Sequence, residues 1–235
     1  MAEKEIALVV GAGTGLGAAL VRCFAAAGMD VAAALRAPGK LSALIEELSG
    51  RARTYACDAT DEAAVRGLFE SVAADQGQPA LVVYNASAFL KKSFLETTPE
   101  ELERCWRVGC LGGFIVGQAA ARIMAPKGAG TILFTGATAS LRGGAGFLNM
   151  AVPKFGLRAL SQTMAREFGP QGIHVAHVII DGQIMSEDRA GLAKERPPDG
   201  LLDAGAIAQN YLSLHRQHRS AWTQELDLRP WVEKF

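Results

Sequence analysis

The chain has 235 residues, of which 49% are hydrophobic and 20% charged, and its 24 Lys and Arg residues balance 24 Asp and Glu residues. A chain of this length can bury one sizeable core, and α/β proteins of this size commonly form a single domain, here residues 1–235. The balanced charge gives no field for attracting a nucleic acid or an anionic membrane, so we expect neither as a partner.

The four cysteines lie among apolar neighbours and have neither disulfide-framework nor metal-ligand spacing: Cys23, Cys57, Cys105 and Cys110. We therefore expect buried, reduced thiols, no metal site and a cytoplasmic location. The first residues run directly into an apolar stretch and lack the layout of a signal peptide. Uncharged stretches such as residues 6–21 are broken by glycine and shorter than the roughly 20 residues of a membrane span.

Short β-like runs alternate with longer helical runs along the whole chain. The patterns predict strands at residues 6–10, 30–35, 53–57, 80–84, 131–134, 174–180 and 221–228, and helices at residues 15–28, 40–49, 61–75, 99–125, 147–169 and 204–215. Most of these strands are nearly continuous apolar runs, which is typical of parallel strands covered on both faces. The alternation predicts an α/β fold: a doubly wound parallel seven-stranded sheet with helices on both faces and a ligand crevice beyond the carboxyl ends of its strands.

The first predicted strand leads into Val-Gly-Ala-Gly-Thr-Gly-Leu-Gly at residues 10–17, and a predicted helix follows. Glycines let a backbone turn sharply and approach a pyrophosphate, while a helix N-terminus offers N–H groups and positive potential. Gly11, Gly15 and Gly17 give the spacing G-x-x-x-G-x-G instead of the widespread G-x-G-x-x-G. We expect a dinucleotide site here, built from Gly11, Gly13, Thr14, Gly15, Leu16 and Gly17.

This spacing resembles that of the short-chain dehydrogenase/reductase family, and further landmarks extend the resemblance over nearly the whole chain. Cys57-Asp58-Ala59 follows the third predicted strand, where the family keeps an Asp for the adenine amino group. Tyr84-Asn85-Ala86-Ser87 is similar to the family's Asn-Asn-Ala-Gly, and Asp181-Gly182-Gln183-Ile184 stands where the family has Pro-Gly followed by Val or Ile. The resemblance implies a Rossmann-like fold, an oxidoreductase with a small-molecule substrate, and cofactor contacts from Asp58, Ala59, Asn85, Ala86, Ser87, Gly182 and Ile184.

The residues after the second predicted strand bear on the choice of nicotinamide cofactor. NAD-dependent relatives place an acidic residue there, whereas this chain has Leu35 followed by Arg36. A neutral residue leaves room for a 2′-phosphate and an arginine can pair with it, which favours NADP(H) over NAD(H). A solvated arginine at a strand end is the alternative, and Thr14 lacks the extra basic charge that some NADP-preferring relatives carry in the loop.

The resemblance also defines a catalytic frame of Asn, Ser, Tyr and Lys, in which the Tyr and Lys stand four residues apart on one helix face. Lys154 matches the lysine, which would hold the nicotinamide ribose. Met150 stands at the tyrosine position, and a thioether has no acidic hydrogen. Gly109 stands at the asparagine position and Ala137 at the serine position. The resemblance therefore implies an atypical member that lacks the catalytic tyrosine.

Other polar residues near this frame are candidates for part of the missing chemistry. Thr138 and Ser140 carry hydroxyl groups close to the serine position, and Thr138 is our catalytic candidate beside Lys154. Asp181 is expected to be a surface or capping residue, with a substitute acid or substrate ligand as the alternative. Pro153 predicts that its helix begins late or kinks beside the lysine.

Two functions remain open. One is an NADP(H)-dependent oxidoreductase in which water, the substrate or another side chain replaces the tyrosine. The other is a catalytically inactive NADP(H)-binding pseudoenzyme that acts as a sensor or partner subunit. Residues 186–203, rich in charge, proline and glycine, are predicted to form a substrate lid.

The resemblance further implies a homodimer or homotetramer paired through the helices at 99–125 and 147–169. Small residues there would permit close helix approach: Gly112, Gly113, Gly117 and Ala119–Ala121. His174 and His177 lie three residues apart on one predicted strand, so their side chains should point to opposite faces and share no metal.

Overall fold

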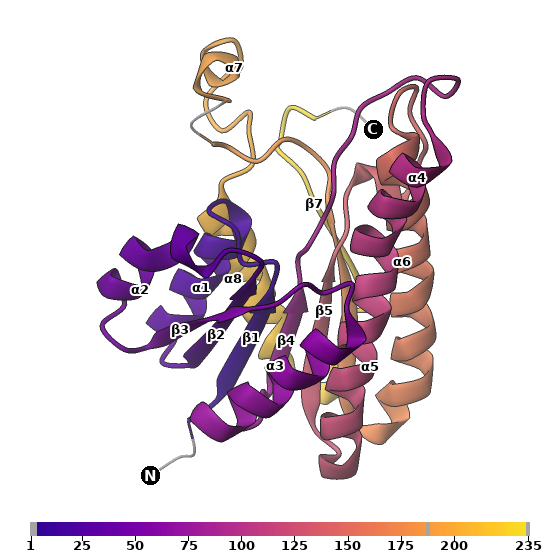
Figure 1. The fold of residues 1–235 in the computed structure, drawn as a ribbon. Coiled ribbons are helices and arrows are strands. Elements are labelled where there is room, and N and C mark those ends of the chain that lie inside the picture. Colours follow the sequence, from indigo (N-terminus) through magenta and orange to yellow (C-terminus); the bar gives the residue numbers. More distant parts are fainter. Residues whose placement is uncertain (1–3, 187–188, 234–235) are drawn as a thin grey trace.

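The structure is a computed structural model of the chain, and it describes residues 4–186 and 189–233. Seven parallel strands form one sheet in the order β3-β2-β1-β4-β5-β6-β7 (Figure 1). The strands are β1 (Ile6–Val10), β2 (Asp30–Leu35), β3 (Ala52–Ala56), β4 (Leu81–Tyr84), β5 (Gly130–Thr135), β6 (Ile173–Ile180) and β7 (Glu225–Leu228). The strand order reverses between β1 and β4, so the predicted doubly wound architecture is confirmed.

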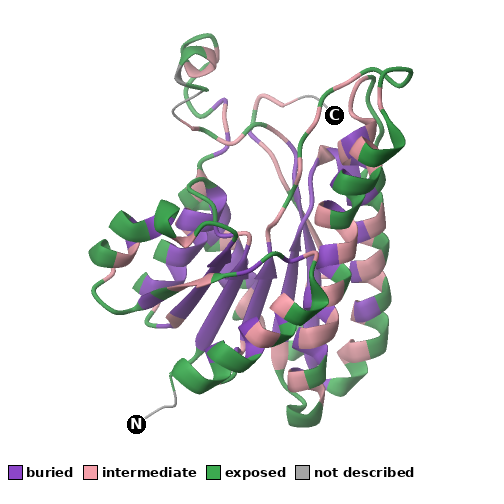
Figure 2. Cartoon of the chain, in the orientation of Figure 1, coloured by how far each residue is buried: buried purple, intermediate pink, exposed green. Residues whose placement is uncertain are grey.

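Helices cover both faces of the sheet. One face packs against α1 (Leu16–Ala26), α2 (Ser42–Glu47) and α8 (Ala204–His215). The other packs against α3 (Glu62–Asp75), α5 (Gly112–Met124) and α6 (Leu148–Phe168). The five interior strands are almost wholly buried while the outer helix faces are exposed (Figure 2), because each interior strand is an apolar run covered from both sides. The edge strands β3 and β7 are only partly buried.

The helix predicted at residues 99–125 is interrupted. The structure has α4 (Pro99–Trp106), a π-helical turn (Arg107–Leu111) and then α5. Val108 in this turn accepts a hydrogen bond from the buried hydroxyl of Tyr84. Gly109 in the same turn lies against α6, since a Cβ added there would be 2.7 Å from the Cβ of Pro153. π-helical turns of this kind often occur beside functional sites.

Within Pro99–Lys127, an 18-residue window has a mean hydropathy of 1.4, which would suffice by length and composition alone for a helix crossing a membrane. Core helices of globular proteins share these properties, and 44% of its most apolar stretch is buried inside the fold.

The structure corrects two expectations about where these elements begin. The helix with Pro153 does not begin late, because the proline falls in its second turn, where it removes one backbone bond, and α6 runs from Leu148 to Phe168. The last strand is shorter than expected and begins at Glu225, since residues 219–221 form a 3₁₀ turn capped by His218.

The small residues of α5 do not lie on an open helix face. A Cβ on Gly113 would collide with Leu157 of α6, and one on Gly117 would lie 2.9 Å from the sulfur of Met164 on the same helix. A Cβ on Gly112 would collide with Tyr84, and Ala120 and Ala121 are buried in the same core. These residues therefore let α5 pack closely within one chain, which corrects the interface role expected for them.

Candidate active site

The glycine loop after β1 is hydrogen-bonded to the residue that follows β4. Asn85 donates its backbone N–H to the carbonyl of Val10 and its side-chain Nδ2 to the carbonyl of Gly11, at 2.8 and 3.0 Å. Gly11 has a φ of +89°, and a Cβ there would collide with the backbone of Ala86. The position therefore requires glycine, both for its conformation and for the close approach of two backbones.

The rest of the loop opens toward the crevice. A Cβ added at Gly13 or Gly15 would have no protein atom within 4 Å, whereas one at Gly17 would lie 2.6 Å from the Cα of Ala12. Gly15 is the N-cap of α1, and no side chain bonds to this helix start. An uncapped helix N-terminus beside an open glycine backbone fits a pyrophosphate, so the residues present suit the expected dinucleotide.

At the ends of β2 and β3 the structure places the predicted adenine-side residues together. Asp58 accepts hydrogen bonds from the backbone and hydroxyl of Thr60 at 2.9 and 2.8 Å. These bonds, and then the positive charges of Arg36 and Arg107, lower the pKa of the Asp58 carboxyl. Leu35 is buried and Arg36 exposed, so a guanidinium group lies at the crevice edge near Asp58.

Lys154 on α6 is 3% exposed, and its Nζ donates a 2.5 Å hydrogen bond to the carbonyl of Thr135 at the end of β5. Burial lowers the pKa of Lys154 to about 8. The lysine is therefore held at the carboxyl end of β5.

Met150 lies one helical turn before Lys154 and packs against a small apolar cluster of Ala137, Ala139 and Ala151. Neither Met150 nor Ala137 offers a polar hydrogen on this side of the crevice. Gly109, the third altered position of the frame, is buried against Pro153.

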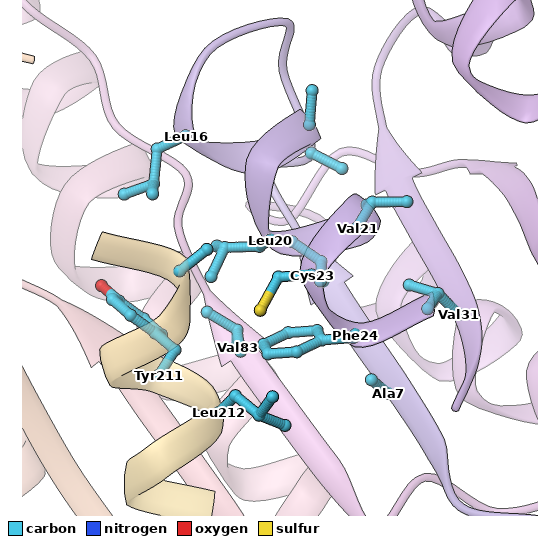
Figure 3. Packing of buried hydrophobic residues seen from close by; sticks show 14 of the residues in the cluster. Ala7, Leu16, Leu20, Val21, Cys23, Phe24, Val31, Val83, Tyr211 and Leu212 are labelled. Carbon is cyan, nitrogen blue, oxygen red and sulfur yellow. The ribbon is translucent and has the colours of Figure 1, made fainter. Parts of the chain in front are cut away.

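All three tyrosines of the chain are described, and each hydroxyl is bonded away from this cluster. Tyr55 donates to a carboxylate on α3, and Tyr84 donates to the π-helical turn. Tyr211 belongs to α8 and is buried on the opposite face of the sheet among Leu20 and Leu212 (Figure 3). Its hydroxyl lies 2.8 Å from the Thr135 hydroxyl.

The two hydroxyl candidates near Ala137 differ in their surroundings. Ser140 is fully buried, and its Oγ accepts the backbone N–H of Ala137 at 3.1 Å and lies 3.4 Å from Nε2 of His177. Thr138 is only half-buried, and its hydroxyl donates a 2.5 Å hydrogen bond to Oδ1 of Asp181. Of the two, Thr138 is the more accessible side chain.

Asp181 is not the surface or capping residue we expected. It is 4% exposed, and besides Thr138 it meets Arg229, whose Nη2 lies 3.6 Å from its Oδ2. Sequence reasoning missed Arg229. The pairing of Ile180 with Leu228 puts Asp181 and Arg229 side by side one residue later, so a correct register of β6 and β7 would have found it.

The two histidines of β6 point to opposite faces, as predicted. His177 faces α6, where its Nδ1 lies 3.4 Å from Glu225, which Arg158 binds in a bidentate pair with both distances 2.7 Å. His174 stacks on Trp222 at the other face. Within the described ranges, no cluster of three or more His, Cys, Asp or Glu side chains could hold a metal ion, and the four cysteines are free thiols.

The remaining predicted residues lie beyond the carboxyl ends of β4 and β6. Ser87 is exposed beyond β4, and Gly182 follows β6 with Pro230 packed close to it. Ile184 bridges to Leu202, which ties the two ends of the predicted lid together. Between them α7 (Ala190–Lys194) stands away from the sheet (Figure 1), while lid residues 187–188 lie outside the described residues.

Comparison with known proteins gives one consistent result. A family model described as short chain dehydrogenase matches residues 5–191. Among curated proteins, the (21S)-21-acetoxyl-apo-melianone synthase of Melia azedarach is 31% identical over 87% of this chain and 76% of its own. The 3-oxoacyl-[acyl-carrier-protein] reductase FabG of Escherichia coli is 29% identical over 88% of this chain and 87% of its own.

Solved structures agree in fold. A short-chain dehydrogenase from Rhodopseudomonas palustris is 37% identical, with a TM-score of 0.84 over 97% of this chain and 99% of its own. A metagenomic short-chain oxidoreductase solved in complex with NADP has a TM-score of 0.83 over 97% of this chain and 98% of its own, at 24% identity, which bears on the fold alone.

Proposed function

Since this chain belongs to the short-chain dehydrogenase family, we propose that it is an NADP(H)-dependent oxidoreductase with an atypical route for proton transfer. The observation that carries this proposal is the open glycine cradle at the start of α1, with buried Lys154 at the same edge of the sheet. A crevice at the carboxyl ends of parallel strands is where such folds bind dinucleotides.

The residues that would hold the cofactor follow from their positions. The backbone of Gly13 and Gly15 would approach the pyrophosphate, and Lys154 would reach the nicotinamide ribose. When bound, the cofactor supplies the hydride chemistry, while the protein orients the substrate and handles the proton. Exposed Arg36 beside a buried, neutral Leu35 supports NADP(H) over NAD(H).

The atypical part of the proposal rests on Met150, Ala137 and Gly109, which leave the family's usual frame without its tyrosine, serine and asparagine. General acid catalysis contributes about 10²–10⁴-fold to a rate, so the loss of one proton donor would slow this chemistry without abolishing it.

Calorimetric titration with NADPH and NADH tests the binding half of the proposal, with tighter binding of NADPH as the expected result. Stopped-flow measurement of NADPH oxidation against aldehydes, ketones, enones and imines tests the chemical half. Rates at background for every substrate would contradict an oxidoreductase. The variant Met150→Tyr is expected to gain carbonyl reductase activity, because it returns a phenolic donor one turn from Lys154.

A second candidate, an inactive NADP(H)-binding pseudoenzyme that acts as a sensor or partner subunit, is favoured by the same three altered positions and by the placement of the three tyrosines elsewhere. It predicts NADPH binding without turnover in the natural chain and a change in assembly when NADPH binds.

We further propose a homodimer or homotetramer paired through α4, α5 and α6. These helices expose large apolar side chains at 38–45% of their surface: Trp106, Phe114, Val152 and Phe155. Such residues are enriched at protein interfaces. Light scattering tests this proposal, and a mass of one chain, 24.8 kDa, would contradict it.

A further inference from the structure

Three polar side chains form a row across the carboxyl ends of β5, β6 and β7. Thr135 of β5 pairs with Val178 of β6, and Thr138 and Asp181 each follow their strand's member of this pair by three residues. Ile180 of β6 pairs with Leu228 of β7, and Asp181 and Arg229 are the residues that come directly after them. Parallel strands end at one edge of a sheet, and the register therefore brings these three residues together at the crevice.

The distances within the row are short. The Thr138 hydroxyl donates to Oδ1 of Asp181 at 2.5 Å, and Nη2 of Arg229 lies 3.6 Å from the other carboxylate oxygen. A hydroxyl-to-carboxylate bond of this length is of the strong, charge-assisted kind. Asp181 is 4% exposed while Thr138 is half-buried, so Thr138 is the more accessible of the two side chains.

Other proton-carrying groups near Lys154 are less accessible. Ser140 and His177 are fully buried, and Lys154 is bonded to the carbonyl of Thr135. Asp227 also pairs with Arg229, yet it is exposed on the last strand, and the bond from the Thr138 hydroxyl goes to Asp181 instead.

We propose that Thr138 and Asp181 are the acid–base pair of this site, with Thr138 contacting the oxygen of an alcohol or carbonyl substrate and Asp181 holding the proton. This inference rests on the proposed function and narrows it to alcohol–carbonyl chemistry, since an alkene offers no oxygen to Thr138.

The proton transfers balance in both directions. In alcohol oxidation, the substrate O–H bond breaks and its proton passes to the Thr138 oxygen, while the Thr138 proton passes to the Asp181 carboxylate. The two electrons leave the substrate carbon with a hydride, which NADP⁺ accepts. In carbonyl reduction, protonated Asp181 returns its proton through Thr138 to the substrate oxygen, and NADPH is the hydride source.

Four variants test the pair: Thr138→Val, Thr138→Ser, Asp181→Asn and, as a matched control, Asp227→Asn. Turnover is measured with NADP⁺ and a panel of secondary alcohols, and in reverse with ketones. We expect Thr138→Val and Asp181→Asn to lower kcat by about 100-fold or more, with NADPH affinity unchanged. Thr138→Ser keeps the hydroxyl and should stay within about tenfold of the natural chain. Asp227→Asn, which alters another carboxylate beside Arg229, should stay within about twofold.

The Met150→Tyr background separates proton transfer from a structural role. A tyrosine donor bypasses Asp181, so Asp181→Asn should cost less than about tenfold there. Equal losses in both backgrounds would assign Asp181 a purely structural role and overturn the inference. Infrared difference spectra between the natural chain and Asp181→Asn give a readout without turnover. The Asp181 carboxylate band should shift in Thr138→Val and return in Thr138→Ser, and an unmoved band would also overturn the inference.

The outcomes distinguish this inference from the proposed function. Turnover that survives Asp181→Asn and Thr138→Val unchanged overturns the acid–base pair and leaves the oxidoreductase intact. A natural chain that binds NADPH yet converts no alcohol or ketone overturns the pair and, if enones and imines also fail, the oxidoreductase with it.

Discussion

The candidate site differs between the two halves of the sheet's carboxyl edge: backbone groups form it beyond β1 and β4, and side chains form it beyond β5, β6 and β7. Beyond β1 and β4 the site is backbone: an open glycine loop, fastened by Asn85 to the strand next to it. Beyond β5, β6 and β7 it consists of side chains, with Lys154, Thr138 and Asp181 in defined contacts. A backbone cradle accepts any dinucleotide phosphate, whereas the chemistry depends on which side chains occupy the second half.

The two halves also differ in the free energy that burying ionisable groups costs. The second half buries ionisable groups, among them Lys154 and His177, and burial disfavours the charged form of each. The glycine loop buries none of these charges. The part of the site beyond β5, β6 and β7 therefore lowers the free energy of unfolding, as functional sites commonly do.

The largest expected effect comes from breaking the backbone half. Gly11→Val places a β-branched side chain at a φ of +89° and against the backbone of Ala86. We expect a loss of about 3 kcal/mol or more in the free energy of unfolding, measured by urea denaturation. Gly39→Val, at an exposed glycine without crowding, is the control, and equal stability of both variants would contradict the tight contact.

Acid should lower the free energy of unfolding through the buried His177 of β6. Burial lowers the pKa of His177 to about 4 from 6.5, so the unfolded chain binds its proton first as pH falls. The contribution of neutral His177 is complete above pH 6.5 and is lost toward pH 4, about 2 kcal/mol of it by pH 5.

His177→Gln should flatten this part of the stability–pH curve, while His218→Gln, at an exposed histidine, should leave it unchanged. His174 and His215, whose pKa values burial also lowers, retain the rest of the slope. An identical slope for His177→Gln and the natural chain would show that His177 is not held neutral.

Lys154→Met should stabilise the free protein while weakening cofactor binding. The pKa of Lys154 falls from 10.5 to about 8, so its charge costs about 3 kcal/mol at pH 7, of which the bond to Thr135 returns about 1. We expect a net gain of about 2 kcal/mol at pH 7 that shrinks between pH 8 and 10.5, as the natural chain loses the proton. Lys40→Met, at an exposed lysine, is the control, and a destabilised Lys154→Met would refute the buried-charge cost.

Gly13→Ala gives the smallest effect and sharpens the contrast with Gly11. No protein atom lies near its added Cβ, so stability should be unchanged. The methyl group projects into the cradle proposed for the pyrophosphate, and NADPH affinity should fall by about tenfold, or about 1.4 kcal/mol, in a fluorescence titration. Unaltered affinity would place the phosphates elsewhere.

Much of the fold could be predicted because the apolar runs are long and regular. The bounds of β1 and β2 are those expected, because a charged residue or a glycine precedes each apolar run and a helical pattern follows it. The close approach of Gly109 to Pro153 was not predictable, because the two residues lie on different helices that meet only in the folded chain. The packing of Gly113 and Gly117 against α6 could not be predicted for the same reason, since spacing shows that a residue is small but not which residue packs against it.

Local patterns of hydrophobicity and spacing are enough to predict the order of strands and helices, the glycine loop and the spacing of Met150 and Lys154 by one helical turn. The contacts between polar groups come only with the folded sheet: Thr138 with Asp181, Asp181 with Arg229, and Ser140 with His177. Each of these contacts joins residues on or just beyond different strands, so it forms only once the strand register is set, and register is a property of the folded sheet.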